Sequence, residues 1–248
     1  MNPWILKKTI PVSNPQYRLF CFPYAGGQAA IYRSWIQSFP ETIEVCAIEL
    51  PGRGRRFGEP LFEKMSDLIP QIAKVLEEFQ DLPFFFFGHS MGSLLAFEMC
   101  RFLRAHQKKL PKTLMVSGCG APQLQSLRNR VLHDLPDEHF FSELERLQGT
   151  PAQVLAHPEL MKLFLPIIRA DLKMVETYSY QTEAPLEIPI IALGGDRDLE
   201  VSLSALSAWR EQSSHPFEEK IFNGDHFFVK SCEEEVMAFV REKLNQFI

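Results

Sequence analysis

The chain has 248 residues, of which 46% are hydrophobic and 23% charged, and its formal net charge is −5. These proportions are typical of a folded globular protein and exclude a disordered, collagen-like or coiled-coil chain. An acidic protein binds nucleic acid poorly, and no apolar run approaches the ~18 residues of a membrane span, so we expect neither partner. The N-terminus lacks a signal-peptide pattern, which favours a cytoplasmic protein.

The five cysteines are scattered and form no C-x-x-C pair. They therefore indicate neither a zinc site nor a disulfide framework, and we expect no bound metal. Most lie in apolar segments, where a thiol is a small buried side chain of a reducing compartment.

Strand-like and helix-like segments alternate along the chain, which predicts an α/β fold with a mostly parallel sheet and helices on both faces. Most of the strand-like runs are apolar without alternation, as in strands covered on both sides. The predicted strands are Arg18–Phe22, Ile43–Leu50, Phe84–Phe87, Thr113–Ser117, Ile188–Leu193 and Phe217–Phe222. The predicted helices of the core are Ser66–Phe79, Ser93–Leu103, Leu203–Gln212 and Glu233–Phe247.

Residues 122–180 interrupt this alternation, because they show helical patterns and no convincing strand. Three helices are expected, at Pro136–Leu147, Pro151–Ala156 and Pro158–Tyr178, each beginning at a proline suited to a first turn. About sixty residues are too many for a plain connection. We therefore predict a core of residues 1–121 and 181–248 and a helical insertion of residues 122–180, which is either a lid over a pocket or a packing subdomain.

If the insertion is a lid, some of its apolar side chains face a bound ligand. The apolar candidates are Phe140, Phe141, Leu160, Met161, Phe164 and Leu165. The alternative is that they anchor the helices to the rest of the fold, and for most of them we favour this alternative.

The segment Gly88–Gly92, with the sequence GHSMG, lies between a predicted strand and a predicted helix. In that context G-x-S-x-G is a nucleophile elbow, a strained turn that exposes the hydroxyl of Ser90. The flanking glycines avoid clashes with the neighbouring strand and helix. The Met91 amide would lie at a helix N-terminus, where it can bind an oxyanion.

A nucleophilic serine needs a general base, and seven histidines compete for that role. His89 adjoins Ser90, but its side chain leaves the turn in another direction. His226 alone follows the last predicted strand, at the sheet edge where α/β sites assemble. Position and chain order therefore favour His226 as the base.

The base in turn needs an orienting carboxylate, and two candidates follow the strand that ends at Leu193. These are Asp196 and Asp198 in the segment Gly194–Asp198, and from local geometry either can reach His226. We favour Asp198. Asp225 is excluded because neighbouring side chains in an extended loop diverge.

The loop Pro23–Gly27 follows an early strand, where the second oxyanion donor of such a site is expected. Its glycines permit close backbone approach, and the Ala25 amide is the candidate donor. The rival interpretation is a phosphate-binding loop. The segment lacks both the G-K-[S/T] ending and the G-x-G-x-x-G spacing, which argues against nucleotide binding.

These motifs form part of a larger set that extends over nearly the whole chain. The set comprises Phe22–Gly27, Leu50–Gly54, Gly88–Gly92, Leu135–Asp137, Gly149–Pro151, Leu165–Asp171, Glu176–Tyr178, Gly194–Asp198 and Gly224–Phe228. With these motifs the sequence resembles the type II thioesterases, the stand-alone α/β-hydrolases that accompany polyketide and non-ribosomal peptide synthases.

The resemblance implies an α/β-hydrolase fold with a helical lid, and it assigns the same residues. Ser90 is then the nucleophile, His226 the base and Asp198 the acid, at the last position of a G-x-x-D segment. The oxyanion donors map to the Ala25 and Met91 amides. One departure is Asp225, where the family commonly has a second glycine before the histidine.

The implied reaction is hydrolysis of acyl thioesters on the phosphopantetheine arm of acyl or peptidyl carrier proteins. Its implied role is editing, the removal of stalled or wrong acyl groups during antibiotic biosynthesis. The substrate brings the phosphopantetheine, so we expect no cofactor, and we expect a monomer. The rivals are an acyl-CoA thioesterase, lipase or esterase with the same triad, and a non-catalytic interaction protein, against which the intact triad argues.

Carrier proteins are usually acidic, so an acidic enzyme needs a local basic surface to bind them. Three arginines lie within four residues of Gly52–Arg56, after a strand that ends on the same sheet edge as Ser90. We expect Arg55 or Arg56 to contribute to docking, with Arg53 a weaker candidate because it can instead brace its own loop. The lysines at 108, 109 and 112 fall toward the far edge, so we expect no docking there.

Overall fold

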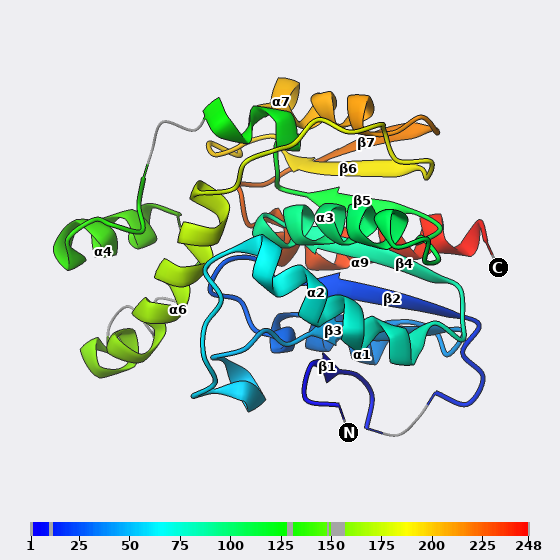
Figure 1. Cartoon of the computed structure of the whole chain (residues 1–248), viewed down its shortest axis with the longest axis horizontal. Helices are drawn as coiled ribbons and strands as arrows, with labels where there is room; N and C mark the ends of the chain where they lie inside the picture. The colour runs from blue at the N-terminus through cyan, green and yellow to red at the C-terminus, as the bar shows by residue number, and fades with distance from the viewer. Residues whose placement is uncertain (1, 10–11, 128–130, 148, 150–156, 248) are drawn as a thin grey trace.

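The computed structural model describes the chain except for residues 1, 10–11, 128–130, 148, 150–156 and 248. The predicted helix Pro151–Ala156 lies outside the described residues. Figure 1 shows a twisted central sheet flanked by helices, with α4 and α6 lying beyond the carboxyl ends of the strands.

Seven strands of the described residues form one sheet, in the order β1-β3-β2-β4-β5-β6-β7. Their bounds are β1 Ile5–Leu6, β2 Tyr17–Phe22, β3 Ile43–Ile48, β4 Phe84–His89, β5 Leu114–Ser117, β6 Ile190–Gly195 and β7 Phe217–Phe222. All pairs are parallel except β1 with β3. The six predicted strands are confirmed within a few residues at their ends, while the two-residue edge strand β1 is too short to predict.

The run of four phenylalanines in β4 shows why these strands are apolar throughout. Side chains alternate across a strand, so Phe84 and Phe86 face one side of the sheet while Phe85 and Phe87 face the other. All four are buried. Each buried phenylalanine contributes about 1.5–3 kcal/mol, so both faces of the central strand are strongly held against helices.

Helices cover the sheet on both sides, as predicted (Figure 1). One face packs against α2 Met65–Leu76, α3 Met91–Ala105 and α7 Leu203–Ser207, and the other against α1 Arg33–Ser38, α8 Phe228–Ser231 and α9 Glu233–Asn245. Short 3-10 turns lie at Ala29–Tyr32, Gly54–Arg56, Glu77–Phe79, Pro122–Leu127 and Ala208–Gln212. No helix among the described residues is long and apolar enough to cross a membrane.

The described part of the insertion contains α4 Asp137–Leu147 and α6 Pro158–Glu176, close to the predicted bounds. A separate apolar cluster joins the two helices. Phe140 and Met161 lie in this cluster with no exposed surface, and Leu165 is also buried there. These three predicted ligand-facing candidates therefore anchor the helices to one another.

Candidate active site

Ser90 occupies a sharp turn between β4 and α3, with φ 52° and ψ −117°. Such a conformation costs about 1–3 kcal/mol for a residue other than glycine. The flanking glycines make it possible: a Cβ on Gly88 would approach the Gly92 carbonyl oxygen to 2.1 Å, and one on Gly92 would approach the Phe22 carbonyl oxygen to 2.2 Å. The Ser90 amide donates to the Ser117 carbonyl at 2.7 Å, which fixes the turn to β5.

The structure brings Ser90, His226 and Asp198 together from three separate loops. His226 Nε2 lies 3.1 Å from Ser90 Oγ, and His226 Nδ1 lies 2.9 Å from Asp198 Oδ2. The carboxylate can only accept, so Nδ1 carries the proton and Nε2 is free to accept from the serine hydroxyl. This is the tautomer that a general base needs.

Asp198 is held rigidly. Its side chain is 1% exposed, and its second oxygen accepts the Glu200 and Val201 amides at 2.8 and 3.1 Å. Each carboxylate oxygen therefore has a fixed partner. Held in this way, the carboxylate fixes the ring plane of His226.

Asp196 has a different place. Its Oδ1 accepts the Gly224 amide at 2.9 Å, and its side chain is about half exposed. It therefore ties the loop that carries His226 to the end of β6 without contacting the imidazole. Asp225 accepts the amide of Phe227 at 2.8 Å, so its carboxylate closes a local turn.

His89 is fully buried behind the triad and does not contact Ser90 Oγ. Its Nδ1 lies 2.9 Å from Ser117 Oγ, and its ring centroid is 5.4 Å from that of His226. Burial, with a smaller effect of the neighbouring His226, lowers the pKa of His89 well below its usual range. His89 is therefore a neutral wall against which the imidazole of His226 packs.

Of the two candidate oxyanion donors, Met91 follows Ser90 in the chain and Ala25 lines the same cavity as Ser90. Met91 begins α3, so its amide has no partner within the helix. Ala25 belongs to a turn closed by the Gly27 amide on the Tyr24 carbonyl at 2.8 Å. The C=O and N–H of a trans peptide point in opposite directions, so the Ala25 N–H points out of this turn.

Two adjoining cavities share Tyr24, Ala25, Gly149 and Ile168 in their walls, and the first of them opens at Ser90. One, of about 350 Å³, contains Ser90 and His226 and extends under the insertion. The other, of about 370 Å³, follows the loop after β2. The insertion contributes six apolar side chains to the walls of the first cavity: Leu132, Leu144, Leu147, Ile168, Leu172 and Val175.

Sequence reasoning missed these wall residues and found only Phe164, which lines the second cavity. The signal was present in α6, where Phe164, Ile168 and Leu172 are spaced four residues apart and share one helix face. An ion pair between Arg146 Nη2 and Glu200 Oε1 at 2.8 Å links α4 to the loop of Asp198 across the first cavity.

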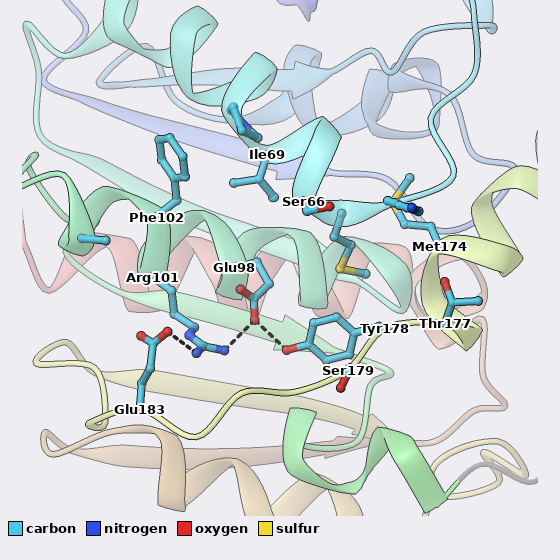
Figure 2. Close-up of a pocket in the computed structure, with 14 residues that line it drawn as sticks. Ser66, Ile69, Glu98, Arg101, Phe102, Met174, Thr177, Tyr178, Ser179 and Glu183 are labelled. Atoms are coloured by element: carbon cyan, nitrogen blue, oxygen red, sulfur yellow. Dashed lines mark hydrogen bonds and ion pairs between the residues drawn. The ribbon is translucent and has the colours of Figure 1, made fainter.

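A larger cavity of about 510 Å³ lies elsewhere, between α2, α3 and the segment after α6 (Figure 2). No histidine or cysteine is among its described lining residues. Its polar groups bind one another: Glu98 accepts from Arg101 Nη1 at 2.9 Å and from the Tyr178 hydroxyl at 2.6 Å, and Arg101 also pairs with Glu183. This cavity therefore offers no activated nucleophile.

The three arginines after β3 differ in exposure. Arg53 is buried and bound to Asp171 of α6. Arg56 is also buried, lies 3.6 Å from the centre of the Trp4 ring and donates to the carboxylate of Glu59. The expectation that Arg56 can present its guanidinium to a partner is therefore wrong. Arg55 is exposed, so docking through Arg55 remains a prediction.

Among the described residues, no group of three or more His, Cys, Asp or Glu side chains could hold a metal ion. The histidines other than His89 and His226 do not approach the serine. His133, for example, binds Glu176 at the base of the insertion.

Comparisons with known proteins agree with this geometry. A family model described as "Thioesterase domain" matches residues 17–244. The chain is 39% identical over 244 residues to the gramicidin S biosynthesis protein GrsT of Aneurinibacillus migulanus. The matched residues cover 98% of this chain and 94% of GrsT.

Two solved structures are similar to nearly the whole chain. The type II thioesterase BorB from the borrelidin biosynthetic cluster is 34% identical, with a TM-score of 0.85 and 97% of both chains covered. ClbQ from the colibactin NRPS/PKS pathway is also 34% identical, with a TM-score of 0.88 and coverage of 94% of this chain and 98% of ClbQ. The predicted α/β-hydrolase fold is thereby confirmed.

Proposed function

Because this chain belongs to the thioesterase family, and within it to the type II thioesterases, we propose that it clears acyl groups from carrier proteins of polyketide or non-ribosomal peptide synthases. The acyl group is held as a thioester on the phosphopantetheine arm of the carrier. The observation that carries the proposal is the hydrogen-bonded series Asp198–His226–Ser90, which ends at a cavity beneath the insertion.

Acylation begins when Ser90 Oγ attacks the thioester carbonyl carbon and its proton passes to His226 Nε2. Asp198 stabilises the imidazolium that forms and keeps the ring in place. The Ala25 and Met91 amides bind the oxyanion of the tetrahedral intermediate. The intermediate collapses with cleavage of the C–S bond, and the departing pantetheine thiolate takes the proton from His226 and becomes a thiol.

Deacylation repeats these steps with water. His226 removes a proton from a water molecule, which attacks the acyl-Ser90 ester. Collapse of the second tetrahedral intermediate releases the carboxylic acid and returns the proton to Ser90 Oγ. A thiolate is a good leaving group, so the chain's own residues and water suffice, and no cofactor is used in this scheme.

Editing is the role that we assign to this reaction. GrsT is a gramicidin S biosynthesis protein and ClbQ comes from the colibactin NRPS/PKS pathway, which supports carrier proteins as the partners. An enzyme whose cavity accepts acyl groups beside Ser90 can hydrolyse stalled acyl groups that the synthase does not extend.

Hydrolysis rates on one acyl group attached to carrier protein, free pantetheine and CoA test the proposal. The proposal predicts the highest kcat/KM for the carrier-bound thioester. Equal kcat/KM for the CoA and carrier thioesters would instead indicate a general acyl-CoA thioesterase. Faster turnover of oxygen esters would indicate a lipase or esterase.

A further inference from the structure

Three segments of the active-site edge meet at one buried carboxylate, that of Asp171 in α6. Its Oδ2 accepts the amide of Gly26 at 2.7 Å, and its Oδ1 accepts Arg53 Nη2 at 2.8 Å. Arg53 Nη1 pairs with Oδ2 and also lies 3.3 Å from the Gly27 carbonyl oxygen. The insertion, the loop after β2 and the loop after β3 are thus joined at a single point.

This ion pair is shielded from water, with side-chain exposures of 3% for Arg53 and 1% for Asp171. Burial of two charges is costly unless their geometry is good and every donor and acceptor finds a partner. Here the guanidinium fork binds both carboxylate oxygens, and its Nε lies 3.3 Å from the Pro51 carbonyl oxygen. Such a unit holds its three segments in one arrangement.

The Gly26 amide that Asp171 accepts is the central peptide of the turn Tyr24–Gly27. Gly26 has φ +75°, the value of the third residue of a type II turn. A type I turn of the same residues would rotate that peptide by about 180° and direct the Ala25 carbonyl oxygen at the carboxylate. Asp171 therefore selects the type II form, which attracts the carboxylate, over the form that repels it.

Helix α6 also packs directly on this turn. A Cβ on Gly26 would lie 2.8 Å from Ile168 Cγ1, so only a glycine lets the helix approach this closely. Ile168 and Ala25 line the same two cavities, one of which contains Ser90. The helix that forms a wall of the acyl cavity thus contacts the turn that carries a proposed oxyanion donor.

We propose that Asp171, paired with Arg53, is a positioning residue that couples the insertion to the oxyanion hole. While α6 is seated over the cavity, Asp171 and Arg53 hold the turn Tyr24–Gly27 in place, and with it the adjoining Tyr24–Ala25 peptide, whose N–H is the proposed oxyanion donor. When α6 leaves, the Gly26 amide loses its acceptor, and the turn loses the contacts that hold it in place. The inference rests on the proposed hydrolysis, because it assigns a role within that reaction.

The alternative is that the ion pair only anchors the insertion. A single Asp171→Asn substitution cannot decide between the two, because it leaves the buried Arg53 charge unpaired and can unfold the protein. Two double variants remove both charges equally: Asp171→Asn with Arg53→Met, and Asp171→Leu with Arg53→Met. Asparagine keeps an oxygen for the Gly26 amide, whereas leucine has a similar shape and no acceptor.

The variants should be compared by steady-state kinetics and by the binding of two pantetheine ligands. An acyl trifluoromethyl ketone forms a tetrahedral adduct with Ser90 whose oxyanion needs the Ala25 amide, whereas the corresponding thioether binds without reacting. We expect the leucine variant to lose about 10- to 100-fold in kcat and in ketone affinity relative to the asparagine variant. KM, thioether affinity and melting temperature should agree between the two.

Equal kcat and equal ketone affinity in the two double variants would overturn the proposal and leave an anchoring role. A loss of thioether affinity that matches the loss of ketone affinity would overturn it as well, because the defect would then lie in binding. The proposed hydrolysis is tested separately by Ser90→Ala: if that variant retains full turnover, the reaction scheme itself fails, whatever the double variants do.

Discussion

The cavity between α2 and α3 and the cavity at Ser90 differ in whether a polar group is free to react with a bound molecule. Between α2 and α3, Glu98, Arg101, Tyr178 and Glu183 bind one another around about 510 Å³ of space (Figure 2). At the start of α3, the hydroxyl of Ser90 stands at the end of a hydrogen-bonded series and faces about 350 Å³. Cavity size alone would thus select the wrong site. Reactivity depends instead on a nucleophile that is hydrogen-bonded to a general base and that faces a cavity large enough for a substrate.

Removal of the nucleophile gives the largest expected effect. Ser90→Ala should lower kcat for an acyl-carrier thioester by about 10⁶-fold, and His226→Ala by a comparable factor, because the two residues act as one unit. Tyr178→Phe removes one hydrogen bond in the other cavity and should leave kcat nearly unchanged. A large loss of kcat in Tyr178→Phe would contradict the assignment of chemistry to the Ser90 cavity alone.

The two aspartates after β6 provide the next contrast. Asp198→Asn presents an amide to Nδ1 and favours the wrong tautomer of His226, so kcat should fall by about 10⁴-fold. Asp196→Asn keeps an oxygen that can accept the Gly224 amide, so this substitution should cost little. Steady-state kinetics of both variants decide the matter: a greater loss in Asp196→Asn would exclude Asp198 as the orienting acid.

The preference of the enzyme for acyl length should change only with substitutions in the cavity at Ser90. Leu172→Ala enlarges the cavity that contains Ser90, so kcat/KM should rise for longer or branched acyl groups relative to short ones. Ile69→Ala opens space in the other cavity and should lower the free energy of unfolding by about 2–5 kcal/mol with an unchanged acyl preference. Rates on an acyl-length series and melting temperatures test this pair. An equal shift in preference for both variants would remove the distinction.

Local patterns were sufficient to predict six strands of the sheet and the pairing of Ser90 with His226. The apolar run Phe84–Phe87 and its glycine predict a buried strand, and chain order places Ser90 and His226 on one edge. The choice between Asp196 and Asp198 needed the path of the turn after β6, because two residues of spacing do not fix which carboxylate reaches a loop 28 residues away.

Long-range contacts explain what sequence reasoning missed. Arg56 looks like a solvated cation in sequence, and it is buried because Trp4, more than fifty residues earlier, covers its guanidinium. Likewise nothing local to Asp171 reveals that Arg53 and the Gly26 amide meet it. Such residues are recognised only when distant segments are placed together.

We expect the carrier protein to dock at the loop after β3 and not at the rim of the larger cavity. Arg55 is exposed on the loop after β3, and Lys64 is exposed at the rim of the larger cavity. Arg55→Glu should raise KM for an acyl-carrier substrate several-fold and weaken its salt dependence, while a small pantetheine thioester is hydrolysed as before. Lys64→Glu is the matched charge reversal. Docking at the larger cavity would give the opposite order of KM values.

The smallest effect concerns stability at low pH. The hydrogen bond from Arg101 lowers the pKa of Glu183, so the ionised carboxylate favours the folded state. That stabilisation is complete above the unfolded pKa of about 4.3 and is lost as pH falls through the lower folded value. Melting temperatures of Glu183→Gln and the unsubstituted protein should therefore converge from pH 6 to pH 3. A gap that widens on acidification would contradict this pairing.

The most direct test of the central claim is the intact mass of the protein, quenched in acid during turnover of an acyl-carrier thioester. The account predicts a species heavier by one acyl group, with the group mapped to the peptide that contains Ser90, and no such species in Ser90→Ala. Hydrolysis by Ser90→Ala at the unsubstituted rate, or an acyl group mapped to another residue, would contradict it.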